Sequence, residues 1–196
     1  MNSMKTMVLS FIVVVGSLIF LGGTMFIQSK LILKSSSFYN GSAIATKYTC
    51  DGENISPQLS WGFDGPQAVG SYVLIVDDPD AQKVVGKTFV HWIALLPASI
   101  TKLPEGVSSM EGSFVHSLNA QIQEMTNSDN MTMYMGPCPP PGSGEHTYRF
   151  TLFALTEPVT TLHAQLPSAP FTAEEFKKAL GNKIIVQTMI TAKYGK

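Results

Sequence analysis

The residues with the clearest chemical potential are carboxylates and histidines at the ends of, or inside, apolar segments. Asp77-Asp78-Pro79-Asp80 directly follows the apolar run 71–76, and its proline forces a turn there. His91 lies inside a second apolar run, 88–96. Taken alone, such an acidic turn is usually a solvated surface loop, and a single histidine in a strand is usually a satisfied core residue.

A second polar group follows a stretch that is rich in proline and glycine. Residues 136–148 have the sequence GPCPPPGSGEHTY, in which four prolines stiffen the chain while Gly142 and Gly144 allow it to turn. Such a loop can direct backbone N–H groups at an anion. His146 and Tyr148 are two residues apart, so on a strand they point to the same side. The stretch is either a plain connector or part of a ligand site.

Four apolar segments are expected to form the strands that position these groups. They are rich in β-branched and aromatic residues and span 71–76, 88–96, 148–155 and 184–191. Alternation along a strand would place His91 on the face opposite both of its neighbours. One helix is expected after Thr172, which can form a capping box with Glu175, and Gly181 would end it. The fold is therefore expected to be mostly β.

The first 35 residues differ in character from the rest. Residues 8–27, VLSFIVVVGSLIFLGGTMFI, are mostly apolar and carry no charge. Twenty residues at about 1.5 Å each can cross about 30 Å of hydrocarbon, which predicts a hydrophobic helix that anchors the protein in a membrane. A cleaved secretory signal stays open as the alternative, although its apolar part is usually shorter. We therefore expect a signal or anchor segment with linker over 1–35 and a domain over 36–196, exported to the periplasm or the exterior.

The charge balance argues against nucleic acid as a partner. Of the 13 basic residues, Lys5, Lys30 and Lys34 precede Ser36, and none of the 14 acidic residues does, which leaves the domain with a net charge of −4. Binding to nucleic acid requires a basic face, and no cluster of basic residues is visible. With 44% hydrophobic and 14% charged residues, the chain has the composition of a globular protein rather than of a disordered one.

Several motifs in a fixed order resemble one family. They are YTCDGENISP (48–57), LSW (59–61), DDPDA (77–81), FVHW (89–92), LPEG (103–106), GPCPPPG (136–142) and GxHxY (144–148). Together they resemble the phosphatidylethanolamine-binding proteins, in particular the prokaryotic Raf-kinase-inhibitor-like or YbhB/YbcL-like branch. The resemblance implies a β-sandwich-like fold with a small pocket at one end. It also implies non-catalytic binding of phosphate or a phospholipid headgroup, no cofactor, and a regulatory or inhibitory role toward an unidentified protein target.

The same motifs assign roles to individual residues. By resemblance, the pocket residues are Asp78, His91, His146 and Tyr148, with Asp80 supporting the turn and Gly136 and Pro137 in the adjoining loop. Polar side chains in or beside apolar segments need partners once buried, so the first four are expected to converge on one cavity. The sequence departs from the family pattern at Gln82, where proline is usual, and over 108–135, which lacks a Gly/Asn-rich approach to the loop.

Cysteine and methionine each raise a separate hypothesis. Cys50 and Cys138 are the two cysteines, and in an exported protein an even pair suggests a disulfide, although free buried thiols fit equally well. Met131, Met133 and Met135 alternate, so they would share one face of a strand. Thioethers select Cu(I), but the ordinary use of methionine is an adaptable apolar wall.

Two rival functions remain beside ligand binding. A hydrolase could use Asp78, His91 and His146 with water or a metal ion, and the methionines could make a Cu(I)-binding protein. The hydrolase is disfavoured because no set of nucleophile, base and orienting group is visible, and no helix carries a pair of histidines. Metal analysis of the purified protein separates both rivals from simple binding.

Overall fold

The computed structural model describes residues 18–21, 24–109 and 121–196. The strands are β1 (Leu18–Leu21), β2 (Thr24–Ile27), β3 (Lys30–Lys34), β4 (Ser42–Ala43), β5 (Leu59–Asp64), β6 (Ser71–Asp78), β7 (Phe89–Pro97), β8 (Lys102–Leu103), β9 (Gln123–Met125), β10 (Glu145–Leu155) and β11 (Ile184–Gly195). The helices are α1 (Gln82–Val85), α3 (Val159–Leu162) and α4 (Ala173–Leu180), with short 3-10 turns at Thr46–Tyr48, His163–Gln165 and Gly181–Lys183. The described chain is thus mostly β, as the sequence predicts.

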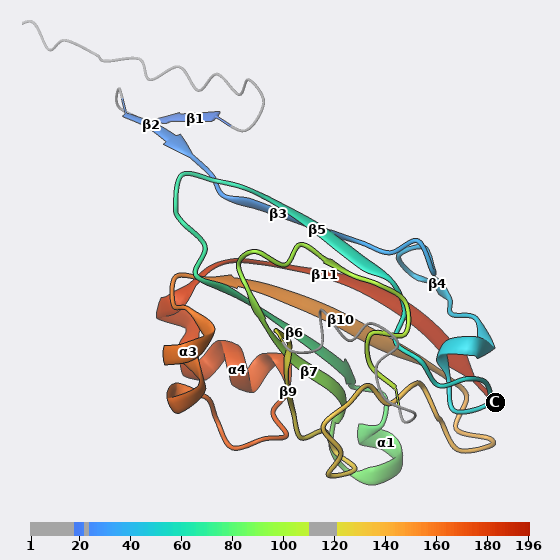
Figure 1. Cartoon of the computed structure of the whole chain (residues 1–196). Coiled ribbons are helices and arrows are strands. Elements are labelled where there is room, and N and C mark those ends of the chain that lie inside the picture. Colours follow the sequence, from blue (N-terminus) through green and yellow to red (C-terminus); the bar gives the residue numbers. More distant parts are fainter. Residues whose placement is uncertain (1–17, 22–23, 110–120) are drawn as a thin grey trace, which may run out of the picture.

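Two sheets form the body of the molecule (Figure 1). The larger has six strands in the order β4-β11-β10-β6-β7-β9, and the smaller has three in the order β3-β5-β8. Neighbouring strands are antiparallel except β4, which runs parallel to β11. At the centre of the large sheet, β6, β7 and β10 bring together three segments that are far apart in the sequence.

Both faces of the central strands are covered, so two cores form. One core lies between the sheets and takes Leu74 and Val76 of β6. The other lies between the large sheet and helices α3 and α4, and takes Val73 and Ile75. All eight residues of β6 are buried. This explains why the strand sequence is a continuous apolar run instead of an alternating one.

The described residues of the N-terminal part form strands. The predicted helix over 8–27 lies largely outside the described residues, since 1–17 and 22–23 are not among them, and β1 and β2 form a two-stranded antiparallel pair. Among described residues, no helix has the length and apolar character needed to cross a bilayer. Residues 30–34, placed in the linker by sequence, form strand β3 on β5, with Leu31 and Leu33 buried. Their alternation with exposed residues is an amphipathic strand pattern.

The remaining elements follow the sequence with two exceptions. The four predicted strands are present as β6, β7, β10 and β11, and Thr172 and Glu175 form the predicted capping box of α4. Gly181 follows the last residue of α4, but its φ of −55° continues into a 3-10 turn, so the left-handed stop expected there does not form. Residues 131–135 form no strand, so the prediction that Met131, Met133 and Met135 share a strand face is wrong. Asn127 holds this segment in a turn by accepting the N–H of Met131 at 3.1 Å.

Candidate functional site

His91 lies at an irregularity in the pairing of the two central strands. Val76 pairs with Trp92 and Asp77 pairs with Val90, so His91 is an extra residue on β7. Val90 consequently packs in the helix-side core and Trp92 in the inter-sheet core. The prediction that His91 points away from both neighbours is therefore wrong, because the bulge interrupts the alternation. A bulge of this kind re-aims a side chain, here toward a cavity at the end of the sheet.

The orientation of the His91 ring is fixed by the chain on its far side. Its Nδ1 lies 2.8 Å from the carbonyl oxygen of Met135, and its own carbonyl accepts the N–H of Met135 at 3.1 Å. The side chain is 4% exposed. Burial lowers the pKa of His91, and the hydrogen bond to Met135 and the nearby charges of Asp78, Asp77 and Asp129 oppose that effect. The buried ring therefore favours the neutral form.

Asp78 organises the turn that follows β6 and also holds the second histidine. Its Oδ1 accepts the N–H groups of Asp80 and Ala81 at 2.8 and 3.2 Å, and its Oδ2 lies 2.6 Å from Nδ1 of His146. Asp80, two residues later in the turn, contacts the same strand as His146. Its Oδ2 accepts the N–H of Thr147 at 3.0 Å, and this hydrogen bond lowers the pKa of Asp80. Asp78 and Asp80 thereby tie the turn to β10.

Tyr148 completes the group from the same strand as His146. The two rings lie with centroids 6.3 Å apart and nearly parallel, and the ring of His91 meets Tyr148 edge-on at 5.2 Å. Tyr148 is 1% exposed, yet its hydroxyl has no hydrogen-bond partner in the described structure. Burial raises its pKa, so the phenol keeps its proton. A buried hydroxyl without a partner costs stability, and a bound ligand would remove that cost.

These side chains meet at one cavity of about 190 Å³. The cavity is lined by four of the residues that the motifs indicate: Asp78, His91, His146 and Tyr148. The same cavity is also lined by apolar residues, namely Val84 and Val85 of α1, Phe89, Met135, Pro139 and Pro140. The cavity therefore offers both polar and apolar side chains to a ligand.

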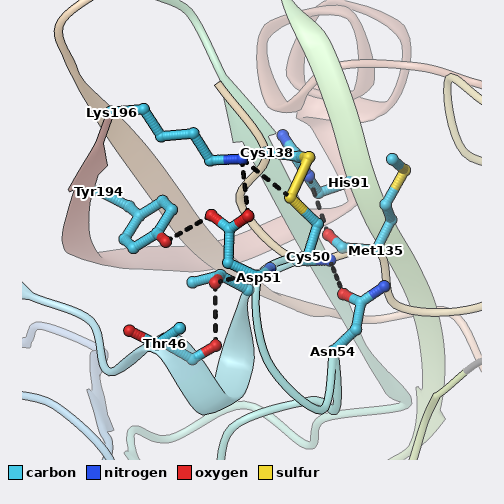
Figure 2. The surroundings of a disulfide bond; sticks show 11 residues. Thr46, Cys50, Asp51, Asn54, His91, Met135, Cys138, Tyr194 and Lys196 are labelled. Carbon is cyan, nitrogen blue, oxygen red and sulfur yellow. Dashed lines mark hydrogen bonds and ion pairs between the residues drawn. A yellow bond between two sulfur atoms is a disulfide. The ribbon is translucent and has the colours of Figure 1, made fainter. Parts of the chain in front are cut away.

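The proline-rich loop is fastened next to this cavity at several points (Figure 2). Cys138 is joined to Cys50 by a disulfide, and the N–H of Cys50 donates to the carbonyl of Pro137 at 3.1 Å. Beside the disulfide, Asp51 accepts from the hydroxyl of Tyr194 at 2.6 Å and pairs with Lys196 at 2.8 Å. The loop is thus tied to the segment after Tyr48, and that segment is tied in turn to the end of β11.

Gly136 and Pro137 support the loop and are not among the residues that line the cavity. The N–H of Gly136 donates to Oδ1 of Asn54 at 2.7 Å, and a Cβ at this position would lie 2.3 Å from the carbonyl oxygen of Tyr48. Only glycine fits so close to another backbone. The expectation that loop amides point at an anion therefore fails at Gly136, whose N–H is already used, and at the prolines, which have none.

Two parts of the cavity wall were missed by sequence reasoning. Val84 and Val85 are 42% and 53% exposed at its rim. The sequence signal that could have indicated them is a pair of valines soon after the acidic turn. Asp129 and Met135 come from the stretch that departs from the family pattern. That stretch is held on β7 because Ser128 accepts the N–H of Val90 at 2.8 Å. No motif predicts this attachment.

Comparison with known proteins places the chain in a family. The family sequence model for phosphatidylethanolamine-binding protein matches residues 34–195. A UPF0098 protein of Pyrococcus horikoshii is 37% identical over 187 residues, which cover 94% of this chain and 85% of that protein. A candidate lipoprotein of Mycobacterium tuberculosis, LppC, is 36% identical over 126 residues, 64% of this chain and 55% of that protein.

A solved structure agrees with this assignment. YbcL of Escherichia coli, described as a member of the mammalian PEBP family, matches with a TM-score of 0.67 and 25% identity, over 85% of this chain and 98% of that one. The matched family model, the shared fold and the cavity formed by the motif residues agree with one another. The chain is a prokaryotic member of the phosphatidylethanolamine-binding protein family.

Proposed function

We propose that the cavity binds a small anionic ligand, a phosphate or a phospholipid headgroup, without catalysing its conversion. The observation that carries this proposal is the buried hydroxyl of Tyr148, which lacks a partner in the described structure and belongs to a ring that contacts both histidines of the cavity. A phosphate oxygen can accept from this hydroxyl and from a protonated imidazole. Asp78 is already engaged with His146 and the turn, so it orients the site instead of touching the anion.

The affinity for an anion should depend on the two histidines. Each hydrogen bond from a protonated imidazole to a phosphate contributes about 1.5–3 kcal/mol. Calorimetric titration of inorganic phosphate into the wild type and into His91→Ala and His146→Ala tests this, with His163→Ala as the matched control because His163 is exposed on another part of the surface. We expect at least a tenfold loss in each cavity variant and none in the control. Unchanged affinity in both cavity variants at intact fold would refute the proposal.

The hydrolase alternative differs in what it needs from the same residues. Two imidazoles whose Nδ1 atoms are held by a carboxylate and a carbonyl resemble the outer support of a metal site. In the described part of the chain, no group of three or more His, Cys, Asp or Glu side chains is placed to hold a metal ion. Metal analysis of the purified protein, with phosphoester turnover measured in parallel, decides between binding and hydrolysis. A stoichiometric metal ion with turnover would replace the binding proposal.

We also propose that the domain is exported and held at a membrane, or released from it after cleavage, by residues 8–27. Support comes from the apolar, uncharged sequence and from the relative LppC, which is named as a candidate lipoprotein. Cell fractionation of the full chain against a version that begins at Ser29 tests this. The later start at residue 36 would remove β3 and disturb the fold. Equal distribution of both versions in the cytoplasm would refute export.

A further inference from the structure

The partners of the two histidines fix where their hydrogens lie. Nδ1 of His91 is 2.8 Å from the carbonyl oxygen of Met135, and a carbonyl can only accept, so this nitrogen carries a hydrogen. Nδ1 of His146 faces Oδ2 of Asp78 at 2.6 Å, while the other oxygen of Asp78 accepts two backbone N–H groups, as expected of a carboxylate. In the neutral form, each ring therefore has a lone pair on Nε2. Neither Nε2 has a hydrogen-bond partner among the described residues.

The cavity in this state offers two acceptors and one donor. The donor is the hydroxyl of Tyr148, and the acceptors are the two Nε2 atoms. Of the charged side chains that face the cavity in the described structure, Asp78 and Asp129 are acidic and none is a lysine or arginine. Burial also favours the neutral form of His91. A fully deprotonated anion would thus meet lone pairs and carboxylates, with one hydrogen bond in its favour.

We infer that this cavity selects phosphates that carry a P–OH group, that is phosphomonoesters or inorganic phosphate, over phosphodiesters. The inference rests on the proposed function and names the ligand class for the same site. A phosphomonoester exchanges its second proton near pH 6, so at neutral pH a proton is available for the contact between Nε2 and a phosphate oxygen. The proton comes from the ligand or from solvent, and it stays in that contact. A phosphodiester has no P–OH, so an imidazole can donate to it only after taking up a proton from solvent.

The apolar residues of the cavity suit the organic part of such an ester. Val84 and Val85 are half exposed and line the same cavity as His146 and Tyr148. Their exposed side chains can contact carbon atoms of the ester while the phosphate lies at the imidazoles. A soluble phosphomonoester and a lipid phosphomonoester share this chemistry.

Calorimetry of the full chain in a mild non-ionic detergent tests the inference with a matched pair of probes. Phosphoethanolamine is a monoester, and glycerophosphoethanolamine carries the same headgroup as a diester. We expect the monoester to bind at least about tenfold more tightly at pH 7, the value of one charge-assisted contact. Titration in two buffers of different ionisation enthalpy should show proton uptake with the monoester at pH 8. Lysophosphatidic acid in place of phosphoethanolamine then separates a lipid source from a soluble one.

The outcomes distinguish this inference from the proposed function. Equal affinities for the two esters, or monoester binding without proton uptake at pH 8, would overturn the selection while leaving anion binding in place. Binding of neither ester nor inorganic phosphate would overturn the proposed function itself.

A single substitution provides an independent check. In His91→Gln the amide donates N–H without needing a proton, and the change spares the carboxylate of Asp78. The preference for the monoester should then fall to less than about threefold, while the control His163→Gln keeps it in full. A preference that survives in a folded His91→Gln would contradict the inference that the lone pair on Nε2 of His91 selects the monoester. If this variant does not fold, the comparison of esters and buffers in the unmodified protein still decides.

Discussion

Asp77 and Asp78 are neighbours in β6, both are buried, and they belong to two very different regions of the molecule. Asp77 faces the helix side, where Arg149 donates to it through two nitrogens at 2.7 and 3.1 Å and the first N–H of α4 adds a third bond at 3.1 Å. Asp78 faces the cavity and holds His146. On the helix side the polar atoms satisfy one another. At the cavity, polar atoms remain available to a ligand.

The difference teaches how one strand can serve stability and binding at once. Successive side chains of a strand point to opposite faces, so two adjacent carboxylates can have independent partners. The charge of Asp77 is matched by Arg149, whose pKa it raises, and also lies at the N-terminus of α4, where negative charge is favourable. Substitutions on the helix side should therefore change the free energy of unfolding, and substitutions at the cavity should change affinity.

Removing Asp77 should have the largest effect. In Asp77→Ala, Arg149 and the first N–H of α4 lose their partner, and breaking such a buried pair costs about 3–5 kcal/mol, with the low end expected because Arg149 is partly exposed. Urea unfolding measures the loss, and Asp64→Ala, which removes an exposed carboxylate, is the control. Phosphate affinity of the folded variant should change far less than in the cavity variants, since Asp77 acts on His91 only through its charge. A large loss of affinity would show that the two regions are coupled.

Removing the disulfide should come next. The bond between Cys50 and Cys138 spans 88 positions of sequence, and a disulfide typically contributes about 2–4 kcal/mol to stability. Urea unfolding of the double variant Cys50→Ala/Cys138→Ala against the wild type measures this. Mass spectrometry after alkylation without reduction establishes whether the bond forms in the native compartment. Two alkylated thiols there would mean that the bond does not contribute in the cell.

Tyr148→Phe should have the opposite effect to Asp77→Ala, because it should lower affinity and leave stability unchanged or higher. Because the variant removes a buried hydroxyl without a partner in the described structure, its free energy of unfolding should stay the same or increase by about 1 kcal/mol. Its affinity for phosphate should nevertheless fall about tenfold, the value of one hydrogen bond to a charged group. Tyr39→Phe, at a side chain that is 87% exposed, is the control for both measurements. Lower stability with unchanged affinity would assign Tyr148 to the core alone.

The smallest effect concerns pH. Burial lowers the pKa of His91 in the folded state, so below about pH 6.5, where the unfolded chain takes up a proton at this residue, the folded chain does not. Stability should therefore decrease as pH falls from 7 to 5, and part of this slope should be absent in His91→Gln but present in His163→Gln. Chemical unfolding at both pH values measures it. Equal slopes in the two variants would mean that His91 titrates as it does in the unfolded chain.

Sequence patterns predicted the strands well because their apolar runs are long and both faces of the central sheet are covered. The motif residues Asp78, His91, His146 and Tyr148 could be named in advance, and the structure brings them to one cavity. The bulge at His91 could not be predicted, because one extra residue in an apolar run does not change the sequence pattern. The wall from Asp129 and Met135 depends on side-chain to backbone bonds over long sequence distances, which no local pattern reports.

The fastening of the proline-rich loop lowers the conformational entropy that binding has to cost. The loop is held by a disulfide, by two hydrogen bonds to the segment 50–54, and by prolines with few accessible conformations. A ligand that enters the cavity therefore does not have to order this wall, and little conformational entropy is lost there on binding. In such a preorganised site, less of the free energy of each new contact is offset by ordering of the protein. This saving matters most for a ligand as small as the phosphate that we propose, because it makes few contacts.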